Sequence, residues 1–206
     1  MKLIDNFDLF KKILDFQSED EFYFVQILIR GKDGHTEQGV NGNNKNRLIK
    51  FYTVKSVEHL TRLEPEIKDI CDAVNGRAYI HPTKRSFSSV GDETLRVTTE
   101  MYLSRNTLGL KGAYSTAAGK SYITSDKKFV IDLDGEDVNK LDEIREFINT
   151  ECEPYSVIKD KYTVPTVHGM HLITSPFNRQ KFSTKYPLID VHTNNPTLLY
   201  FKDTNF

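Results

Sequence analysis

Two aspartates stand one residue apart in the segment FVIDLD, at residues 129–134. The segment has the alternation of a strand, so Asp132 and Asp134 are expected to project to the same face as Val130. Same-face neighbours lie roughly 6–7 Å apart along a strand, which lets both carboxylates reach one divalent cation or a pair of cations. A carboxylate between apolar neighbours is costly to bury without such a partner. The pair therefore predicts a metal site, whereas an acidic turn before a helix explains only the acids that follow.

A second group of polar residues, Thr166, His168, Gly169 and His171, leads into the apolar segment HLIT. The glycine would let a ligand approach the backbone closely, and His171 could hydrogen-bond a phosphate oxygen. The alternative is a surface hairpin whose histidines have no function. Three cations that follow favour a phosphate site because they supply countercharge: Arg179, Lys181 and Lys185.

Asp190 stands in a third short apolar segment, between Ile189 and Val191. One more carboxylate there would complete a metal site with Asp132 and Asp134. The alternative is a turn-forming aspartate, since two asparagines and a proline follow closely.

The elements that must position these residues can be expected from periodicity and from breaker residues. Helices are expected at residues 3–16, 57–75, 92–111 and 138–149. The second of these would be capped by Ser56 and stopped by Gly76, and Pro65 could break it into two pieces. In the third helix, the residues expected to face inward are Leu95, Met101, Leu103 and Leu108. Strands are expected at residues 22–30, 48–54, 77–81, 129–134, 156–158, 163–164, 170–174 and 197–201. A mobile connection is expected at residues 32–46 and a small-residue loop at 114–128.

This mixture of helices and strands predicts an α+β fold whose later strands form antiparallel hairpins. We expect a single domain over residues 1–206, which the middle loop could divide into an N-terminal lobe, 1–112, and a second lobe, 128–206. The two lobes would share one cleft.

The composition excludes several classes of protein. The 206 residues carry 28 Lys and Arg against 29 Asp and Glu, and no apolar run approaches the roughly 20 residues of a membrane helix. The first residues lack the apolar stretch of a signal peptide, so a cytoplasmic protein without membrane partners is expected. Cys71 and Cys152 are in no CxxC pair and are expected to be buried as small apolar residues.

Charge is unevenly distributed along the chain. Residues 131–153 contain nine acids and two cations, whereas residues 155–187 contain five cations and one acid. Residues 28–55 are also basic, through Arg30, Lys32, Lys45, Arg47, Lys50 and Lys55. A fold that brings these regions together would suit a metal ion with a polyanion.

The three motifs together resemble the archaeo-eukaryotic primase superfamily, the primase-polymerases. The resembling features are a strand with two acids spaced by one residue, a later small-x-His strand at residues 169–171, and a further apolar strand with Asp190. They occur in the family's order between residues 129 and 201. The chain is most similar to a small stand-alone member of phage or mobile-element type.

The resemblance implies an RRM-like antiparallel catalytic sheet with helices, joined to an N-terminal α/β lobe. It assigns Asp132, Asp134 and Asp190 to Mg²⁺ or Mn²⁺, and His171 to the phosphates of a nucleoside triphosphate. The implied activity is a metal-dependent nucleotidyltransferase that copies a single-stranded DNA or RNA template, with a replication partner that the residues do not specify. In that reaction a 3′-hydroxyl attacks the α-phosphorus.

Further cations could serve the same reaction. Arg179 and Lys181 could hold the triphosphate, and Arg77, Lys84 and Arg85 could bind triphosphate or template. Arg77 could equally pair with a surface acid. Two nearby aromatic residues could stack on bases or belong to the core: Tyr79 and Phe87.

Two other classes of protein fit parts of the pattern. A catalytically inactive nucleic-acid-binding module with an RRM-like sheet would need only the basic segments, but it leaves the two aspartates unexplained. A metal-dependent phosphoesterase would use His168, His171 and His192 with the acids. If residues 168–171 form a continuous strand, His168 and His171 point to opposite faces, which disfavours a shared metal.

Overall fold

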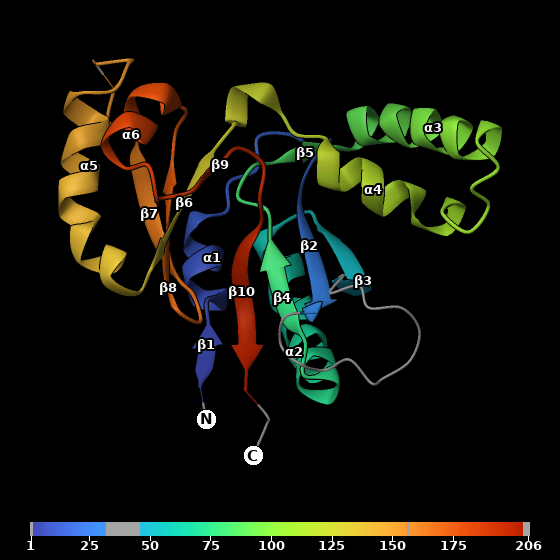
Figure 1. Ribbon diagram of the computed structural model, residues 1–206. Helices are drawn as coiled ribbons and strands as arrows, with labels where there is room; N and C mark the ends of the chain where they lie inside the picture. Colours follow the sequence, from blue (N-terminus) through green and yellow to red (C-terminus); the bar gives the residue numbers. More distant parts are fainter. Residues whose placement is uncertain (1, 32–45, 156, 204–206) are drawn as a thin grey trace.

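Two antiparallel sheets with surrounding helices make up the residues that the computed structural model describes, 2–31, 46–155 and 157–203 (Figure 1). The predicted α+β class is confirmed. The first sheet has the order β1 (Leu3–Asp5), β10 (Thr197–Lys202), β4 (Arg77–Ile80), β2 (Glu21–Ile29), β3 (Arg47–Val54), with β5 (Arg85–Ser86) paired to β2. The second has the order β7 (Asp160–Pro165), β8 (Gly169–Thr174), β6 (Phe129–Asp134), β9 (Val191–His192).

Six α-helices and three short 3₁₀ segments lie between the described strands. The α-helices are α1 (Phe7–Ile13), α2 (Val57–Val74), α3 (Phe87–Leu103), α4 (Ala113–Lys120), α5 (Leu141–Thr150) and α6 (Arg179–Lys185). The 3₁₀ segments are η2 (Leu110–Gly112), η3 (Thr124–Asp126) and η4 (Gly135–Lys140). Among the described helices, none is long and apolar enough to cross a membrane.

One face of each sheet is closed by helices. On the first sheet, α1 and α2 bury a row of apolar side chains against β2, β4 and β10. On the second sheet, α5 and α6 cover the face that carries Phe129, Ile131 and Leu133. Each such side chain that is fully buried contributes about 1.5–3 kcal/mol to the stability of the fold.

The face of the second sheet that α5 and α6 leave uncovered packs toward α1 and the first sheet. Val130 and Ile173 from the second sheet belong to the same buried cluster as the first sheet and α2. Phe10 on α1 packs edge-on against Tyr162 on β7, with ring centroids 6.5 Å apart. The sheets therefore share one core, and polar residues at its margin face each other across a gap.

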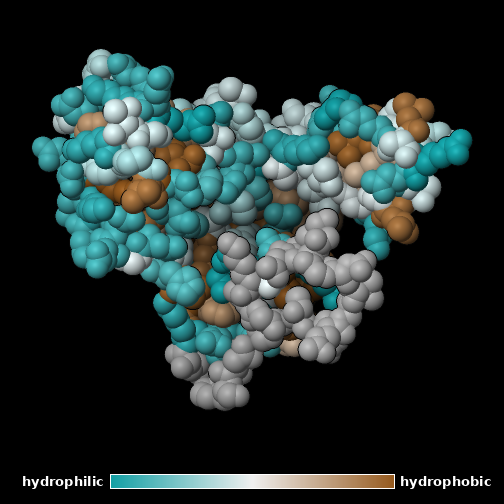
Figure 2. All heavy atoms as spheres, viewed as in Figure 1, coloured by the Kyte–Doolittle hydropathy of each residue, from teal (hydrophilic) through white to brown (hydrophobic). Residues whose placement is uncertain are grey.

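Helices α3 and α4 form a pair that projects from this body (Figure 1). Small residues allow close packing, because Ala117 and Ala118 of α4 lie against Phe22 and Phe24 of β2. The outer end of the pair presents hydrophobic surface (Figure 2), where Leu103 and Leu108 are exposed.

Several element predictions are confirmed within a residue or two. These include β2, β3, β4, β6, β8 and β10, and the helix that Ser56 caps by accepting a hydrogen bond from the His59 amide. That helix runs unbroken through Pro65 and ends at Asn75, which takes the left-handed conformation before Gly76. The central strands and the amphipathic helix were predictable because, in these elements, the buried residues recur with the period of the strand or the helix.

Other element predictions are wrong. The first residues form β1 and then a shorter helix, because Leu3 and Ile4 pair with the distant β10. The third helix begins at Phe87, where the Ser86 side chain accepts from the Ser89 amide. It buries Val90 and Val97, while Leu95, Leu103 and Leu108, which were expected inward, are exposed.

The expected loop at 114–128 contains α4 and η3, since alanines pack in a helix as well as in a loop. Residues 157–158 form no strand, and Ser156 lies outside the described residues, as does most of the expected connection at 32–46 with Lys32 and Lys45. Helix α6 was not predicted.

The expected division into lobes 1–112 and 128–206 does not follow the sheets. The chain leaves the first sheet after β5, builds the second sheet, and returns to the first with β10. There β10 lies between β1 and β4, paired with both. Strand β10 thus completes the sheet of the N-terminal half, so the two sheets do not coincide with the two expected lobes.

Candidate functional site

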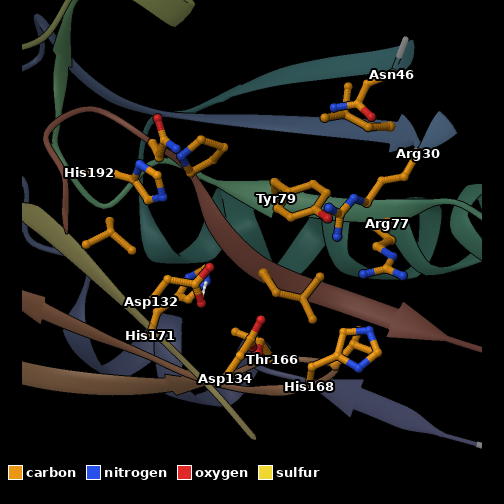
Figure 3. Close-up of a pocket in the computed structure, with 16 residues that line it drawn as sticks. Arg30, Asn46, Arg77, Tyr79, Asp132, Asp134, Thr166, His168, His171 and His192 are labelled. Atoms are coloured by element: carbon orange, nitrogen blue, oxygen red, sulfur yellow. Dashed lines mark ion pairs between the residues drawn. The ribbon is translucent and has the colours of Figure 1, made fainter. Parts of the chain in front are cut away.

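A cleft of about 550 Å³ lies where the open faces of the two sheets meet (Figure 3). The second sheet contributes Val130, Asp132, Asp134, His171 and His192, and the first contributes Leu28, Arg77, Tyr79 and Leu198. Connecting segments add Arg30, Asn46, Thr166, Val167, His168, Asn195 and Pro196. Polar groups of both signs thus converge in one concave space, the usual setting for a ligand site.

Asp132 and His171 form the central pair of the cleft. They face each other in register on the adjacent strands β6 and β8, and His171 Nε2 lies 3.3 Å from Asp132 Oδ1. The hydrogen bond from His171 lowers the pKa of the Asp132 carboxyl, partly opposed by burial, and the charges of His192 and Arg30 add to the lowering. The carboxylate therefore stays ionised in a strand whose neighbours are fully buried.

The other ring nitrogen of His171 is held from the first sheet. Thr197, at the start of β10, places Oγ1 2.7 Å from His171 Nδ1. Its side chain is fully buried. The imidazole is therefore fixed at both nitrogens by residues from different sheets.

Asp134 ends β6 and is exposed at the mouth of the cleft, on the predicted face with Asp132 and Val130. It pairs in register with Gly169. A Cβ atom on Gly169 would lie 1.9 Å from the Leu133 carbonyl oxygen, so no other residue fits without moving the backbone. The glycine serves strand pairing, because the close approach is made by β6 and not by a ligand as the sequence suggested.

Two arginines face the carboxylates across the cleft. Arg30 follows the end of β2, and Arg77 begins β4. Arg77 is almost fully buried, and its guanidinium carbon lies 4.5 Å from the ring centroid of Phe201. Figure 3 shows Asp132 and His171 on one side and Arg30, Tyr79 and Arg77 on the other. One wall is suited to a cation and the other to an anion.

Asp190, the third expected metal ligand, lies outside the lining of the cleft. Its side chain is exposed, and only its backbone carbonyl is engaged at the site, accepting from the Asp132 amide at 3.1 Å. The residue lies beside the correct strand, but its carboxylate is not among the groups that converge on the cleft.

The cations expected to follow the histidine motif also lie elsewhere. Arg179, Lys181 and Lys185 are on α6, which packs on the opposite face of the second sheet. There Lys181 contacts Glu151 at 3.5 Å, and Lys185 contacts Glu143 at 3.1 Å. Because a sheet has two faces, nearness in sequence did not place these residues in the cleft.

Lys84 and Arg85 are buried and do not line the cleft, whereas Arg77 does. Lys84 Nζ pairs with Glu21 at 2.8 Å. Arg85 donates to the carbonyl oxygens of Thr83 and Ala118, to His81 Nδ1 and to Asn194 Oδ1. Burial lowers the pKa of Arg85 to about 9, so it remains charged at neutral pH. Both residues hold segments of the fold together.

All three histidines of the phosphoesterase alternative line the cleft. His168 lies in the turn before β8, where strand alternation does not apply, and so it opens to the same side as His171. Because β8 begins at Gly169, the continuous strand on which these two residues would point to opposite faces does not form. His192, on β9, pairs in register with Val130.

Some residues of the site were missed. Arg30 was noticed only as part of a basic segment, although a cation at the end of a strand before a glycine is a usable signal. Thr197, Asn46 and Asn195 gave no signal, because their place in the cleft depends on strand order.

The donor set suits only certain cations. Among the described residues, no group of three or more His, Cys, Asp and Glu side chains is arranged to hold a metal ion. Mg²⁺ is usually bound by one or two carboxylates together with waters and substrate phosphates, not by a cage of protein ligands. Asp132 and Asp134, which open into a cleft with arginines, fit that kind of site.

In comparisons with known proteins, the chain matches no protein-family model, no curated protein and no solved structure.

Proposed function

We propose that the cleft binds a nucleoside triphosphate with a divalent cation, and that the protein is a nucleotidyltransferase of the primase-polymerase type acting on a single-stranded DNA or RNA template. The observation that carries the proposal is the opposition of charges: Asp132 and Asp134 open into the same cleft as Arg30 and Arg77. A triphosphate with its cation is a ligand that uses both walls at once.

The order of elements in the second sheet also supports the proposal. β6, α5, β7, β8, α6 and β9 follow one another as β-α-β-β-α-β, with β6 and β8 in the centre of the sheet. This is the order of the ferredoxin-like arrangement. An RRM-like catalytic sheet of this kind would carry its two acids at the end of its first strand, which is where Asp132 and Asp134 lie.

The side chains divide the work by charge. Asp132 and Asp134 would hold Mg²⁺ or Mn²⁺, and when bound the cation would lower the pKa of the attacking hydroxyl and neutralise the triphosphate. Arg30 and Arg77 would donate hydrogen bonds to phosphate oxygens. Tyr79, half-buried on β4 and part of the cleft lining, offers a ring on which a base can stack.

A metal-dependent phosphoesterase is the second candidate. His168, His171 and His192 all line the cleft with the two carboxylates, and imidazole is a common metal ligand and proton donor. This reading predicts hydrolysis of a phosphate ester without a template, and it predicts that activity depends on His168 and His192.

The test is incorporation of labelled nucleotides on single-stranded and primed templates with Mg²⁺ or Mn²⁺. Asp132→Asn should lose about a hundredfold or more of the activity, since it removes one ligand and the anionic partner of His171. Asp142→Asn, an exposed acid on α5, is the matched control and should keep the wild-type rate.

The other outcomes identify the alternatives. Template-independent hydrolysis that depends on His168 would establish the phosphoesterase. Binding of single-stranded DNA without turnover in wild type, retained in Asp132→Asn, would establish the inactive binding module. Equal activity of wild type and Asp132→Asn would remove the carboxylates from the mechanism.

A further inference from the structure

Thr197 is a buried residue of the first sheet whose side chain contacts a cleft residue of the second sheet, His171. It begins β10, and its hydroxyl oxygen lies 2.7 Å from His171 Nδ1 on β8. The side chain has no exposed surface, so the hydroxyl cannot act on a ligand directly. It can instead fix the tautomer and the orientation of the His171 imidazole.

The position of the imidazole proton follows from the two neighbours. An aspartate side chain is ordinarily ionised at neutral pH, and a carboxylate only accepts hydrogen bonds. His171 Nε2, 3.3 Å from Asp132 Oδ1, must therefore carry a hydrogen. In a neutral imidazole Nδ1 is then a bare acceptor, and the Thr197 hydroxyl is the donor that faces it.

We infer that Thr197 is a positioning residue for the cleft: its hydroxyl donates to His171 Nδ1 and so keeps the ring in one tautomer and one orientation, with the Nε2–H turned toward Asp132 and the cleft. The valine methyl that would replace this hydroxyl has the same shape but donates nothing. The ring would then lose its fixed partner on the buried side.

The consequence for ligand binding rests on the proposed function. In the cleft, a phosphate oxygen can replace Asp132 as the acceptor of the hydrogen bond from His171 Nε2–H (Figure 3). A fixed ring presents this donor without first losing rotational freedom, which strengthens binding. Thr197 should therefore affect phosphate affinity although it touches no ligand.

The chain offers a close control. Thr174, at the far end of the same strand β8, is also fully buried, and its hydroxyl has no hydrogen-bond partner among the described residues. Thr174→Val removes a buried hydroxyl without removing a hydrogen bond. Thr197→Ser keeps the donor and removes only a methyl group.

The test has one spectroscopic and one binding measurement. Nitrogen chemical shifts of the His171 ring, recorded at about pH 8 where imidazole is ordinarily neutral, report the tautomer. Wild type, Thr197→Ser and Thr174→Val should show the Nε2–H form alone, whereas Thr197→Val should show a mixture. Calorimetry with Mg²⁺–ATP should show affinity about tenfold weaker in Thr197→Val and near wild type in the other two variants.

Each result has a clear reading. An unmixed Nε2–H tautomer in Thr197→Val, or an equal loss of affinity in Thr174→Val, would overturn the inference. Failure of wild type to bind Mg²⁺–ATP would count against the proposed function, and the tautomer measurement would still decide the role of Thr197. If Thr197→Val does not fold, Thr197→Ala with the serine variant as rescue takes its place.

Discussion

Asp132 carries a carboxylate into a strand where Ile131 and Leu133 are fully buried, and His171 is what allows it to remain charged there. The pair is made by strand register, since Asp132 and His171 are directly opposite on β6 and β8. A shift of one strand by one residue would turn its own polar side chain, Asp132 or His171, to the helix-covered face and so break the pair. Residues that hold the register are therefore as important to the cleft as the polar residues in it.

Gly169 is the residue at which this register can be tested. Gly169→Ala places a Cβ against backbone atoms of Leu133 and Asp134, which cannot rotate away, and it should lower the free energy of unfolding by about 1–3 kcal/mol. Denaturant unfolding measures the change, and amide exchange should show the loss to be concentrated at the ends of β6 and β8.

Gly91→Ala is the matched control for that substitution. Gly91 lies on the exposed side of α3, and no other atom lies within 4 Å of the position that an alanine Cβ would take there, so alanine should raise stability by about 0.5–1 kcal/mol. Equal stability of wild type and Gly169→Ala would show that the two strands are not pressed together as described.

Among the elements, α4 shows how a connecting segment can determine the position of the cleft wall. Its carbonyl oxygens at Gly119 and Lys120 accept from the Asn194 side chain, and Arg85 donates to Ala118 and to Asn194 Oδ1. Asn194 lies in the connection between β9 and β10, next to Asn195 of the cleft lining. The buried guanidinium of Arg85, on β5, thus links the end of α4 to this connection through hydrogen bonds.

Arg85→Leu should therefore destabilise the fold by about 3 kcal/mol or more, because it leaves several buried acceptors without their donor. Chemical denaturation measures the loss, and amide exchange should increase first in α4 and in residues 193–196. Arg96→Ala, an exposed cation on α3 with only surface ion pairs, should change stability by less than about 1 kcal/mol. Similar effects of the two substitutions would contradict a central role for Arg85.

At the scale of the whole molecule, the return of β10 to the first sheet joins both halves of the chain. β10 fills the place between β1 and β4, and its first residue holds His171 of the second sheet. Asn6 adds a second link, since its side chain donates to Pro165 on β7 and to Leu198 on β10. The first sheet cannot be completed without β10, and the second sheet, whose strands all lie within residues 129–192, cannot bury Val130 and Ile173 without the N-terminal half.

We therefore expect the fragments 1–127 and 128–206 to remain unfolded when produced separately. The first would lack the strand between β1 and β4, and the second, although its own sheet is complete, would expose Val130 and Ile173, which the intact chain buries against residues of the N-terminal half. Circular dichroism and amide dispersion in NMR spectra measure this. Fusing residues 196–203 to fragment 1–127 through a flexible linker should restore structure, whereas a folded fragment 1–127 would show that β10 is dispensable.

Local pattern was sufficient for much of the fold and for the centre of the site. The alternation in FVIDLD predicted both the strand and the shared face of Asp132 and Asp134, and periodicity with a Ser56 cap predicted α2. These predictions hold because the burial of a central strand or an amphipathic helix imposes a period on its own residues. His171 was found because it directly opens an apolar strand.

The rest depended on which segments the chain brings together. Leu3 and Ile4 have helical spacing but form a strand, because β10 offers backbone partners at that edge. Asp190 and Lys181 have suitable charges and positions in the sequence, yet one side chain is exposed outside the cleft and the other lies behind the sheet. Charge and type are properties of a residue, whereas the direction of a side chain at a strand end or on a covering helix follows from packing.

The composition and the three motifs alone thus establish an α+β chain with paired carboxylates on one strand face. Only the tertiary structure assigns Arg30, Arg77 and Thr197 to the same place as Asp132. Arg77 was a candidate from the sequence and Arg30 stood in a basic segment, but no local pattern places them beside Thr197 and Asp132, because what unites these distant residues is the meeting of two sheets around one shared core.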